Sequence, residues 1–470
     1  MTSATSELLA AIQADAESGQ EVRDPATGEV IGYAPIRTVD DLNAAVEAAR
    51  AAQPAFEALG HKERSKLLHA AADALEENAE ALATILSREQ GKPLEGPNAR
   101  FEVGGSIAWL RGAADTPLET ETILNDETGR ATLTYRALGV VGAIGPWNWP
   151  MMITVWQIAG SLRMGNTVVV KPSEYTPLSV LALIHVMNTV LPKDVLIVVA
   201  GGREVGAAMS AHDGFDKIMF TGSTATGKKI VESSASNLPR LTMELGGNDA
   251  GIVLDDVNPS EIAMDLFWGA FINTGQTCAA MKRLYVPDSI YDEVVAALVE
   301  VAKSMPMGVG LDEANVLGPL QNKAQFDIVD RLVKAAIEGG ATVALGGNPD
   351  YDAEGYFYPT TIVTDIDPDN PLVVEEQFGP ALPVIRYTDL DEAIAEANKL
   401  EFGLGSSVWS SNRERAIEVA SRIVAGTTWI NSHGGVDPRI PFGGVKGSGY
   451  GLEFGVEGLK AVARPHVING

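Results

Sequence analysis

Short apolar segments that alternate with helical stretches constrain the fold of this chain more than any other feature. Between Ala137 and about Arg240, the segments GVVGAIG, NTVVVKPS, DVLIVVAG and DKIMFTGS read as strands separated by helical stretches. This order predicts βαβ units and a parallel sheet covered on both faces. Ligands of such sheets bind at the carboxyl ends of the strands, where the loops PWNWP, KPSE, AGGREVG and FTGSTATG fall.

A second alternating region runs from about Leu245 to Ile430. Its strand-like segments are AGIVL, RLYVP, TTIVT, ALPVIRY, SSVWS and TTWIN, and amphipathic stretches such as FDIVDRLVKAAIEGG separate them. A chain of 470 residues is too long for one ordinary core, so we expect a second α/β domain with a boundary near Met243. Residues from about 40 to 112 show helical spacing and predict packed scaffold helices.

The charge of the chain excludes some classes of partner. A formal net charge of -27, from 62 acidic and 35 basic residues, opposes attraction to nucleic acid or anionic lipid, so we expect neither as a partner. No charged residue intervenes between Arg136 and Arg163, a length that could cross a bilayer. Glycines, Pro146 and Pro150 interrupt this stretch, which favours a buried strand, a tight loop and a helix.

The numbers and positions of cysteine and histidine residues limit which metal sites and which cellular compartment are expected. One cysteine excludes an internal disulfide and any CxxC zinc site, and none of the six histidines pairs with another at metal-ligand spacing. We therefore expect an enzyme without a metal. The first twenty residues lack the basic and apolar blocks of a signal peptide, so the expected compartment is the cytoplasm.

The single cysteine, Cys278, is the candidate nucleophile. It follows Gly275, Gln276 and Thr277 and precedes two alanines, and such small neighbours would let a substrate approach the sulfur. A helix starting here would favour the thiolate. An inert core cysteine is the alternative.

Two loops at strand ends suggest a nucleotide site. The segment FTGSTATGKK around Gly222 follows a strand and opens a helix, where free N–H groups hold phosphate. Lys229 occupies the position at which an ATP or GTP loop needs Ser or Thr, which disfavours nucleotide hydrolysis and leaves a plain helix cap as the alternative. Glu174 in KPSE suits a hydrogen bond to ribose hydroxyls, so the pair of loops favours a dinucleotide.

Two further residues carry open alternatives. Glu244 closes the strand-like LTME before two glycines, so it is either a general base with a raised pKa facing a cleft or an ordinary salt-bridged strand end. His433 lies in a glycine-rich loop, and a satisfied loop histidine is favoured over a pocket-facing one.

Together these motifs resemble the NAD(P)-dependent aldehyde dehydrogenase superfamily from about residue 20 to 465. PWNWP, KPSE, FTGSTATG, MELGGN, GQTCAA, EEQFGP and PFGGVKGSG occur in the order of that family. The resemblance implies two open parallel-sheet, Rossmann-like domains and a small β oligomerisation arm in a homodimer or homotetramer. It places the NAD-binding domain at 1–118 and 139–243, the catalytic domain at 244–445, and the arm at 119–138 and 446–470.

The resemblance also implies a covalent mechanism. Cys278 would attack the aldehyde carbonyl to form a thiohemiacetal, whose oxyanion is held by the Asn148 amide and the Cys278 backbone N–H. Hydride transfer to the nicotinamide would leave a thioester, which water activated by Glu244 would hydrolyse. Glu453 is at the position of a second carboxylate of the family, which is proposed to relay protons.

For the ligands, the resemblance implies NAD as cofactor, because the Glu174 carboxylate would repel the 2′-phosphate of NADP, which remains the alternative. The expected substrate is a small aldehyde, uncharged and aliphatic or aromatic, although His433 and Arg439 near the tunnel mouth keep semialdehydes open. The implied cofactor-binding positions are Ile144, Pro146, Trp147, Lys171, Ser173, Glu174, Gly202, Gly206, Gly222, Ser223, Leu245, Glu376 and Phe378. The implied substrate-binding positions are Trp149, Met152, Trp156, Val436 and Phe442.

Three rival readings remain open on the sequence. The first is an aldehyde dehydrogenase that transfers the acyl group to coenzyme A. Relatives of that kind commonly lack the base at the position of Glu244, so this residue distinguishes the two reactions. A non-redox thiol esterase would need a histidine near Cys278, which the sequence does not identify. The third is a noncatalytic protein with the same fold. Such a protein would not need Cys278, Glu244 and Asn148, so their presence disfavours it.

Overall fold

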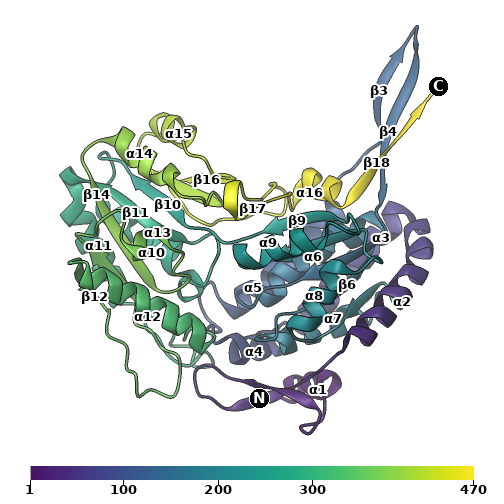
Figure 1. The fold of residues 1–470 in the computed structure, drawn as a ribbon, viewed down its shortest axis with the longest axis horizontal. Helices are drawn as coiled ribbons and strands as arrows, with labels where there is room; N and C mark the ends of the chain where they lie inside the picture. Colours follow the sequence, from purple (N-terminus) through teal and green to yellow (C-terminus); the bar gives the residue numbers. More distant parts are fainter. Residues whose placement is uncertain (1) are drawn as a thin grey trace.

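The computed structural model describes residues 2–470 and is built around two open sheets, with a small third sheet that projects from the body (Figure 1). The first sheet has the order β17-β9-β8-β5-β6-β7, and all of its strands are parallel except β17. Its strands are β5 (Val140–Ile144), β6 (Thr167–Lys171), β7 (Leu196–Val198), β8 (Lys217–Thr221), β9 (Arg240–Glu244) and β17 (Gly449–Tyr450). Its helices are α6 (Pro150–Met164), α7 (Pro177–Met187), α8 (Arg203–Ala211) and α9 (Thr224–Ser233). The predicted parallel sheet is confirmed.

The second sheet has seven strands in the order β12-β13-β14-β11-β10-β15-β16. They are β10 (Asp249–Val253), β11 (Met281–Pro287), β12 (Thr342–Leu345), β13 (Thr361–Thr364), β14 (Ala381–Tyr387), β15 (Gly405–Trp409) and β16 (Thr427–Ile430). Only β12, an edge strand that the sequence did not predict, runs antiparallel. Accompanying helices are α10 (Pro259–Phe271), α11 (Tyr291–Lys303), α12 (Lys323–Glu338), α13 (Pro371–Val374), α14 (Leu390–Lys399) and α15 (Arg413–Ala420). The second α/β unit is thus confirmed, while its boundary near Met243 stays a prediction.

The N-terminal part supplies helices that pack beneath the first sheet. They are α1 (Ser3–Ile12), α2 (Val39–Ala58), α3 (Gly60–Glu77), α4 (Ala79–Gln90) and α5 (Ala99–Asp115), with the hairpin β1 (Gly19–Arg23) and β2 (Val30–Pro35) between the first two. Helix α5 buries Ala99, Glu102, Val103, Ser106 and Ile107 on one stripe, which packs on α3 and α6. An acidic residue, Glu102, therefore lies on the buried face.

The projecting sheet consists of β3 (Glu121–Asp126), β4 (Gly129–Ala137) and β18 (Ala463–Asn469), in the order β18-β4-β3. Figure 1 shows this arm extending away from both sheets. The predicted arm segment 446–470 is only partly correct, since β17 pairs with β9 and α16 (Gly455–Ala461) packs on α6. Gly449 makes the pairing possible, because a Cβ there would lie 1.9 Å from the Met243 carbonyl oxygen.

The uncharged stretch between Arg136 and Arg163 forms β5, a loop and α6, as predicted. Across residues 2–470, no helix has the length and apolar character needed to cross a membrane. The carboxyl ends of β5, β6 and β8 instead open onto the cavity described next.

Candidate active site

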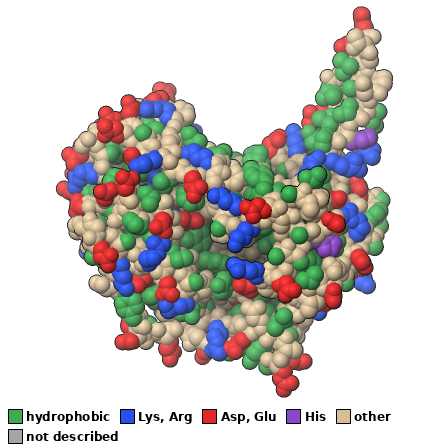
Figure 2. All heavy atoms as spheres, in the orientation of Figure 1, with side chains coloured by type: hydrophobic (Ala, Val, Ile, Leu, Met, Phe, Trp, Pro, Cys, Tyr) green, Lys and Arg blue, Asp and Glu red, His purple; other side chains and the backbone are tan. Residues whose placement is uncertain are grey.

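A cavity of about 770 Å³ lies between the two sheets. Loops that follow β5, β6 and β8 form one wall, and residues 245–246, 278, 376 and 378 form the other. Figure 2 shows a hollow on this face with apolar side chains inside and Lys and Arg side chains at its rim. The predicted residues on its wall are Ile144, Pro146, Trp147, Asn148, Lys171, Ser173, Glu174, Gly206, Gly222, Ser223, Leu245, Cys278, Glu376 and Phe378.

One end of the cavity has the properties of a phosphate site. Helix α9 begins here, with Ser223 as its N-cap accepting a hydrogen bond from the Thr226 N–H at 3.3 Å. Gly222 and Ser223 lie on the wall, so the backbone N–H groups of this helix start are close to a ligand. A Cβ at Gly206 would lie 3.4 Å from the Lys171 side chain, so a side chain there would fill part of the cradle. Backbone groups beside a strand-end lysine and a carboxylate fit a dinucleotide.

Lys171 and Glu174 follow β6 at this end. Lys171 is buried and its Nζ donates to the Pro172 carbonyl at 3.0 Å, and burial lowers the pKa of its ammonium while Glu174 opposes that shift. Glu174 is exposed at the rim. Gly202 is outside the cavity wall, but a Cβ there would lie 3.8 Å from the Glu174 carboxylate, which places this glycine directly beside it.

Aromatic rings and a carboxyl group form the other end. Trp147 and Phe378 meet edge to face with 5.3 Å between their ring centroids. Glu376 accepts a hydrogen bond from the Gly247 N–H at 3.0 Å, and burial raises the pKa of its carboxyl to about 7 against the opposing effect of Lys282. Phe378 has a φ of +46°, a strained conformation for a bulky residue that aims its ring at the cavity.

Cys278 lies in a turn on the cavity wall, and the chain then enters strand β11 at Met281. The predicted helix start is therefore wrong, because a turn and then strand β11 follow Cys278 instead of a helix. Burial raises the pKa of the thiol to about 12, and the nearby carboxylates of Glu244, Glu376 and Asp249 act in the same direction.

The loop that carries Cys278 is held by buried polar groups. Lys282 donates from Nζ to the carbonyls of Gly275 at 2.9 Å and Thr277 at 2.6 Å. Trp149 donates from Nε1 to the Thr277 hydroxyl at 2.9 Å. Asn273, with a φ of +51°, reverses the chain ahead of the loop. These contacts fix the sulfur in position before any ligand binds.

Asn148 reaches the same loop from the first sheet. Its Nδ2 donates to the Gln276 carbonyl at 3.0 Å, two residues before Cys278. An amide nitrogen carries two hydrogens, so the second remains for a ligand oxygen. The structure thus brings the candidate nucleophile and the candidate oxyanion donor together from facing walls of the cavity.

Glu244 and Glu453 are buried carboxylates outside the lining of this cavity. Glu244 ends β9, and burial, followed by the nearby Glu453, raises the pKa of its carboxyl well above the usual value. Burial raises the pKa of Glu453 to about 8, against the opposing effect of Lys217. Among the hydrogen bonds within residues 2–470, none reaches either oxygen of Glu453 or Oε1 of Glu244. Buried carboxyl groups with raised pKa values are typical of groups that exchange protons during catalysis.

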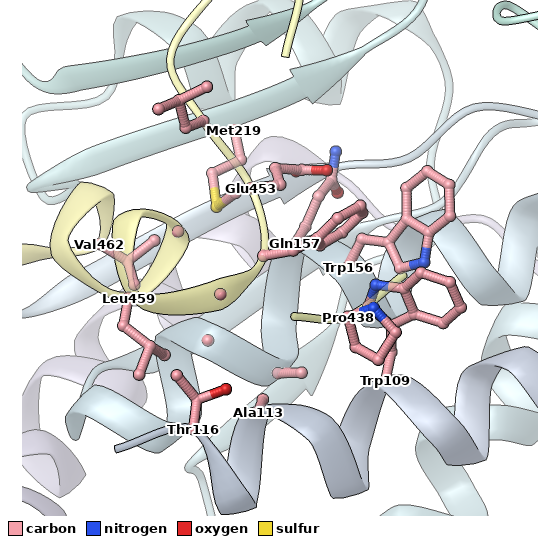
Figure 3. A pocket seen from close by; sticks show the side chains of 16 residues that line it. Trp109, Ala113, Thr116, Trp156, Gln157, Met219, Pro438, Glu453, Leu459 and Val462 are labelled. Atoms are coloured by element: carbon pink, nitrogen blue, oxygen red, sulfur yellow. The ribbon is translucent and has the colours of Figure 1, made fainter. Parts of the chain in front are cut away.

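Glu453 borders a second cavity of about 30 Å³, which is room for water. Figure 3 shows Glu453, Gln157, Trp109 and Trp156 around it. The ring centroid of Phe454 is 4.9 Å from that of Trp156 and 5.4 Å from that of Trp109.

Of the predicted substrate positions, Trp156 borders this second cavity. Trp149, Met152 and Phe442 are buried, and Val436 is half-buried against the same core. None of the five is on the wall of the large cavity.

His433 and Arg439 do not form a charged mouth. The His433 side chain is fully buried, with Nδ1 2.8 Å from the Ser407 hydroxyl and Nε2 3.5 Å from the Asp249 carboxylate. The favoured interpretation, a satisfied loop histidine, is only partly correct, because Nε2 is buried without a hydrogen-bonding partner among residues 2–470. The predicted placement of His433 at the mouth is wrong, because the ring turns into the core. Arg439 is exposed and donates twice to the Asp437 carboxylate, which pairs its charge.

Sequence reasoning missed the charged groups that support these loops. Lys92 and Glu102 form an ion pair with both side chains fully buried, and Lys282 holds the cysteine loop. Glu102 had a readable signal, since it falls on the apolar stripe of a helical segment. Lysines in loops and strands had no comparable signal. In the described part of the chain, no group of three or more His, Cys, Asp or Glu side chains is arranged to hold a metal ion.

The raised pKa of the thiol gives a first prediction. The rate of Cys278 alkylation by iodoacetamide should rise about tenfold per pH unit from pH 7 to 9, because the thiolate fraction grows in that proportion below a pKa of about 12. A small thiol with an ordinary pKa of about 8.5 is the control and should level off. Glu376→Gln should speed alkylation at pH 9 by removing a nearby negative charge. A plateau of the wild-type rate below pH 9 would contradict this picture.

The chain was compared with known proteins. A model described as the aldehyde dehydrogenase family matches residues 12–468. The chain is 39% identical to the aldehyde dehydrogenase LUC3 of a Fusarium species over 438 residues, 93% of this chain and 92% of the relative. It is 37% identical to the phenylacetaldehyde dehydrogenase of Pseudomonas fluorescens over 462 residues, 96% of this chain and 92% of the relative. PnpE from Pseudomonas sp. WBC-3, solved in complex with nicotinamide adenine dinucleotide, is 38% identical with a TM-score of 0.93, covering 98% of this chain and 95% of its own.

Proposed function

The chain belongs to the aldehyde dehydrogenase family, and from that premise we propose that it oxidises an aldehyde to a carboxylic acid with NAD through a thioester on Cys278. One observation carries the proposal. Cys278 and Asn148 lie on the wall of a cavity whose far end combines a helix start with Lys171 and Glu174. A nucleophile, an amide donor and a nucleotide-like site in one cavity are what the reaction needs.

The cavity fits NAD in size and in donor set. Lys171 and Glu174 would hold the adenosine ribose, Gly222 and Ser223 the pyrophosphate, and the end with Trp147, Glu376 and Phe378 the nicotinamide. NAD, when bound, accepts the hydride that leaves the aldehyde carbon. The NAD complex of PnpE supports this assignment. Glu174 disfavours the 2′-phosphate of NADP, and KM values for the two dinucleotides measure that preference.

Cys278 supplies the covalent step. The thiol first loses its proton to solvent; the thiolate sulfur then forms a bond to the carbonyl carbon, and the carbonyl electron pair moves to the oxygen, which becomes an oxyanion. The Asn148 amide and the Cys278 backbone N–H donate to that oxygen. Because the thiol has a raised pKa in the free protein, this step speeds up as pH rises.

Glu244 serves the second half of the reaction. After the hydride has left, the acyl group is a thioester on Cys278, and water must attack its carbonyl. Glu244 takes a proton from that water, a role suited to a buried carboxylate whose pKa lies well above the usual value. Collapse of the intermediate breaks the C–S bond, releases the acid and restores the Cys278 thiolate. Glu453 then takes the proton from Glu244 toward the small cavity.

The substrate we propose is an uncharged aliphatic or aromatic aldehyde. Trp149, Met152, Trp156, Val436 and Phe442 belong to one apolar and aromatic cluster, and the first of them follows Asn148 in the chain. A phenylacetaldehyde dehydrogenase among the relatives agrees with an aromatic substrate. A charged aldehyde gains no partner from His433 or Arg439, since both are engaged within the protein.

Asn148→Ala tests the oxyanion site. Loss of one oxyanion donor should lower kcat by about 10²- to 10³-fold and leave the Kd for NAD unchanged, because the amide acts only as negative charge develops on oxygen. Steady-state NADH formation and NAD titration measure the two quantities. A loss confined to KM for the aldehyde would assign Asn148 to ground-state binding instead.

The proposed function is tested by absorbance at the reduced-nicotinamide band, with NAD and a panel of aliphatic, aromatic and acidic aldehydes. NADH formation with acid as product supports it. If the product appears only as an acyl-coenzyme A, and only when coenzyme A is added, the enzyme is acyl-transferring. The presence of Glu244 disfavours that alternative. Ester cleavage without NADH from any aldehyde would favour a thiol esterase.

The arm suggests a homodimer or homotetramer. It projects from the body and exposes apolar side chains, among them Ile123, Val467 and Ile468. We propose that it pairs with another copy of the chain, which light scattering would show as a mass of two or four chains. For the compartment we propose the cytoplasm, where the free Cys278 thiol stays reduced, and cell fractionation measures it.

A further inference from the structure

We propose that Lys92 and Glu102 are positioning residues, a buried ion pair that sets the Asn148 amide at the distance from Cys278 needed to hold the oxyanion. The inference rests on the proposed role of Asn148 in aldehyde oxidation. It adds that two residues outside the cavity hold Asn148 in place for that role. Neither residue lines the cavity, so neither touches the substrate or the cofactor.

Lys92 acts on the Asn148 backbone. Its Nζ donates to the Glu102 carboxylate at 2.6 Å and to the Asn148 carbonyl at 2.8 Å, and it lies 3.6 Å from the ring centroid of Trp149. One ammonium therefore contacts the peptide of the oxyanion donor and the residue that follows it. Trp149 is tied in turn to the Thr277 hydroxyl, next to Cys278.

Glu102 acts on the helix that starts behind this loop. Its Oε1 accepts hydrogen bonds from the N–H groups of Met151 at 2.8 Å and Met152 at 3.2 Å, in the first turn of α6. No side chain at the N-cap position, Trp149, does this. The carboxylate thus anchors the helix while its other oxygen, Oε2, holds Lys92. Asn148 lies between these two anchors.

A closed ring of hydrogen bonds links the pair to the cysteine loop. The Asn148 carbonyl accepts from Lys92 Nζ and also from Asn273 Nδ2 at 2.9 Å. Asn273 Nδ2 donates at 3.2 Å to the Gln276 carbonyl, the same oxygen that accepts from the Asn148 side chain. Moving the Asn148 peptide therefore moves its amide relative to the Cys278 loop.

Stability alone is a weak reason for such a pair. Burying two charges costs desolvation that often equals their attraction, and apolar replacements of buried pairs are commonly neutral. Every other bond that Lys92 Nζ and the Glu102 carboxylate make ends within residues 148–152. A pair directed at one short segment fits positioning, since misplacement by about 1 Å is enough to slow a reaction.

The test uses the double variant Lys92→Met/Glu102→Gln. Methionine keeps an apolar chain against Trp149, and the glutamine oxygen still accepts from the start of α6, so no unpaired charge is left. The control is Glu89→Gln, another fully buried carboxylate that accepts from a helix start, the N–H groups of Leu178 and Ser179 in α7. Melting temperatures show that the variants are folded. Lys92→Leu/Glu102→Gln, which also leaves no unpaired charge, serves as a second variant if the first does not fold.

Two reactions of the same thiol separate positioning from general damage. Acylation of Cys278 by 4-nitrophenyl acetate without cofactor forms an oxyanion, whereas alkylation by iodoacetamide forms none. We expect acylation, and kcat for the aldehyde, to fall about 10- to 100-fold in the double variant. Alkylation should stay within about twofold of wild type, and Glu89→Gln should leave all three rates unchanged. In the Asn148→Ala background the same double substitution should have almost no further effect, since the pair acts through Asn148.

Three outcomes would overturn the inference: an unchanged acylation rate, an equal fall in acylation and alkylation, or the same fall with and without Asn148. The proposed function fails separately, through absence of NADH formation by the wild type. In that event the ratio of acylation to alkylation still decides whether the ion pair positions Asn148.

Discussion

Replacing Cys278 by alanine should lower NADH formation from any aldehyde by at least about 10⁴-fold, because no other group can form the covalent adduct. Cys278 is the only cysteine of the chain and lies on the cavity wall. Stopped-flow absorbance should show neither a burst nor a steady state. Iodoacetamide should no longer label the protein at all.

The control for this variant is cofactor binding. Replacing a thiol with a methyl group takes away no charge and no hydrogen bond on the NAD side, so quenching of Trp147 fluorescence by NAD should give an unchanged Kd. NADH formation that survives in Cys278→Ala would exclude a thioester mechanism. Loss of NAD binding in this variant would mean that the cavity had changed shape, and activity would then say nothing about the nucleophile.

Glu244→Gln should produce a single burst of NADH, about one per active site, followed by a steady state about 10²- to 10⁴-fold slower than wild type. Acylation needs Cys278 and Asn148, whereas release of the acid needs a base for water, and an amide at residue 244 cannot accept a proton. Mass spectrometry of the stalled protein should show the acyl group on Cys278. A steady state at the wild-type rate would remove Glu244 from the mechanism.

The same variant carries a pH-dependent stability signature. The folded state raises the pKa of Glu244, so it binds a proton more tightly than the unfolded chain does. Folding stability supplied by that proton is present at pH 4 and is lost as pH rises above about 4.5, the unfolded value. An amide has no such loss, so Glu244→Gln should gain melting temperature over wild type at pH 9 and gain less at pH 5. Glu89 is a second carboxyl group whose pKa is raised, in this case to about 7. Glu89→Gln should therefore show the same pH dependence of the melting temperature, but no burst of NADH.

Local patterns were enough for most elements of the fold. The strands β5, β6 and β8 are fully buried five-residue strands with an apolar centre, and a parallel sheet under helices is the structure that such strands favour. The edge strand β12 was missed because its four residues are partly exposed and lack a clear apolar run. The pairing of β17 with β9 was also missed, since it joins residues about 200 apart through a two-residue strand.

For the candidate site, too, some features could be predicted from the sequence and others could not. The motifs around Gly222 and Asn148 lie at the carboxyl ends of strands, so topology predicted that they would share a cavity, whereas the family resemblance added Cys278 to that site. The electrostatic setting of Cys278 could not be read in this way. The sequence suggested a helix start that favours the thiolate, whereas the folded chain buries the sulfur near three carboxylates, and both effects raise the pKa of the thiol.

By itself the sequence determined the two α/β units and the order of the motifs, because strand and helix periods and the residues at strand ends are properties of neighbouring positions. Only the tertiary structure decided that Glu453 is buried without a hydrogen-bonding partner, that His433 turns into the core, and that Lys92 and Glu102 brace Asn148. Burial, pKa and ion pairing depend on groups brought together from distant parts of the chain. Lys92 and Asn148 are 56 positions apart, and only the packing of α5 and α6 makes them neighbours.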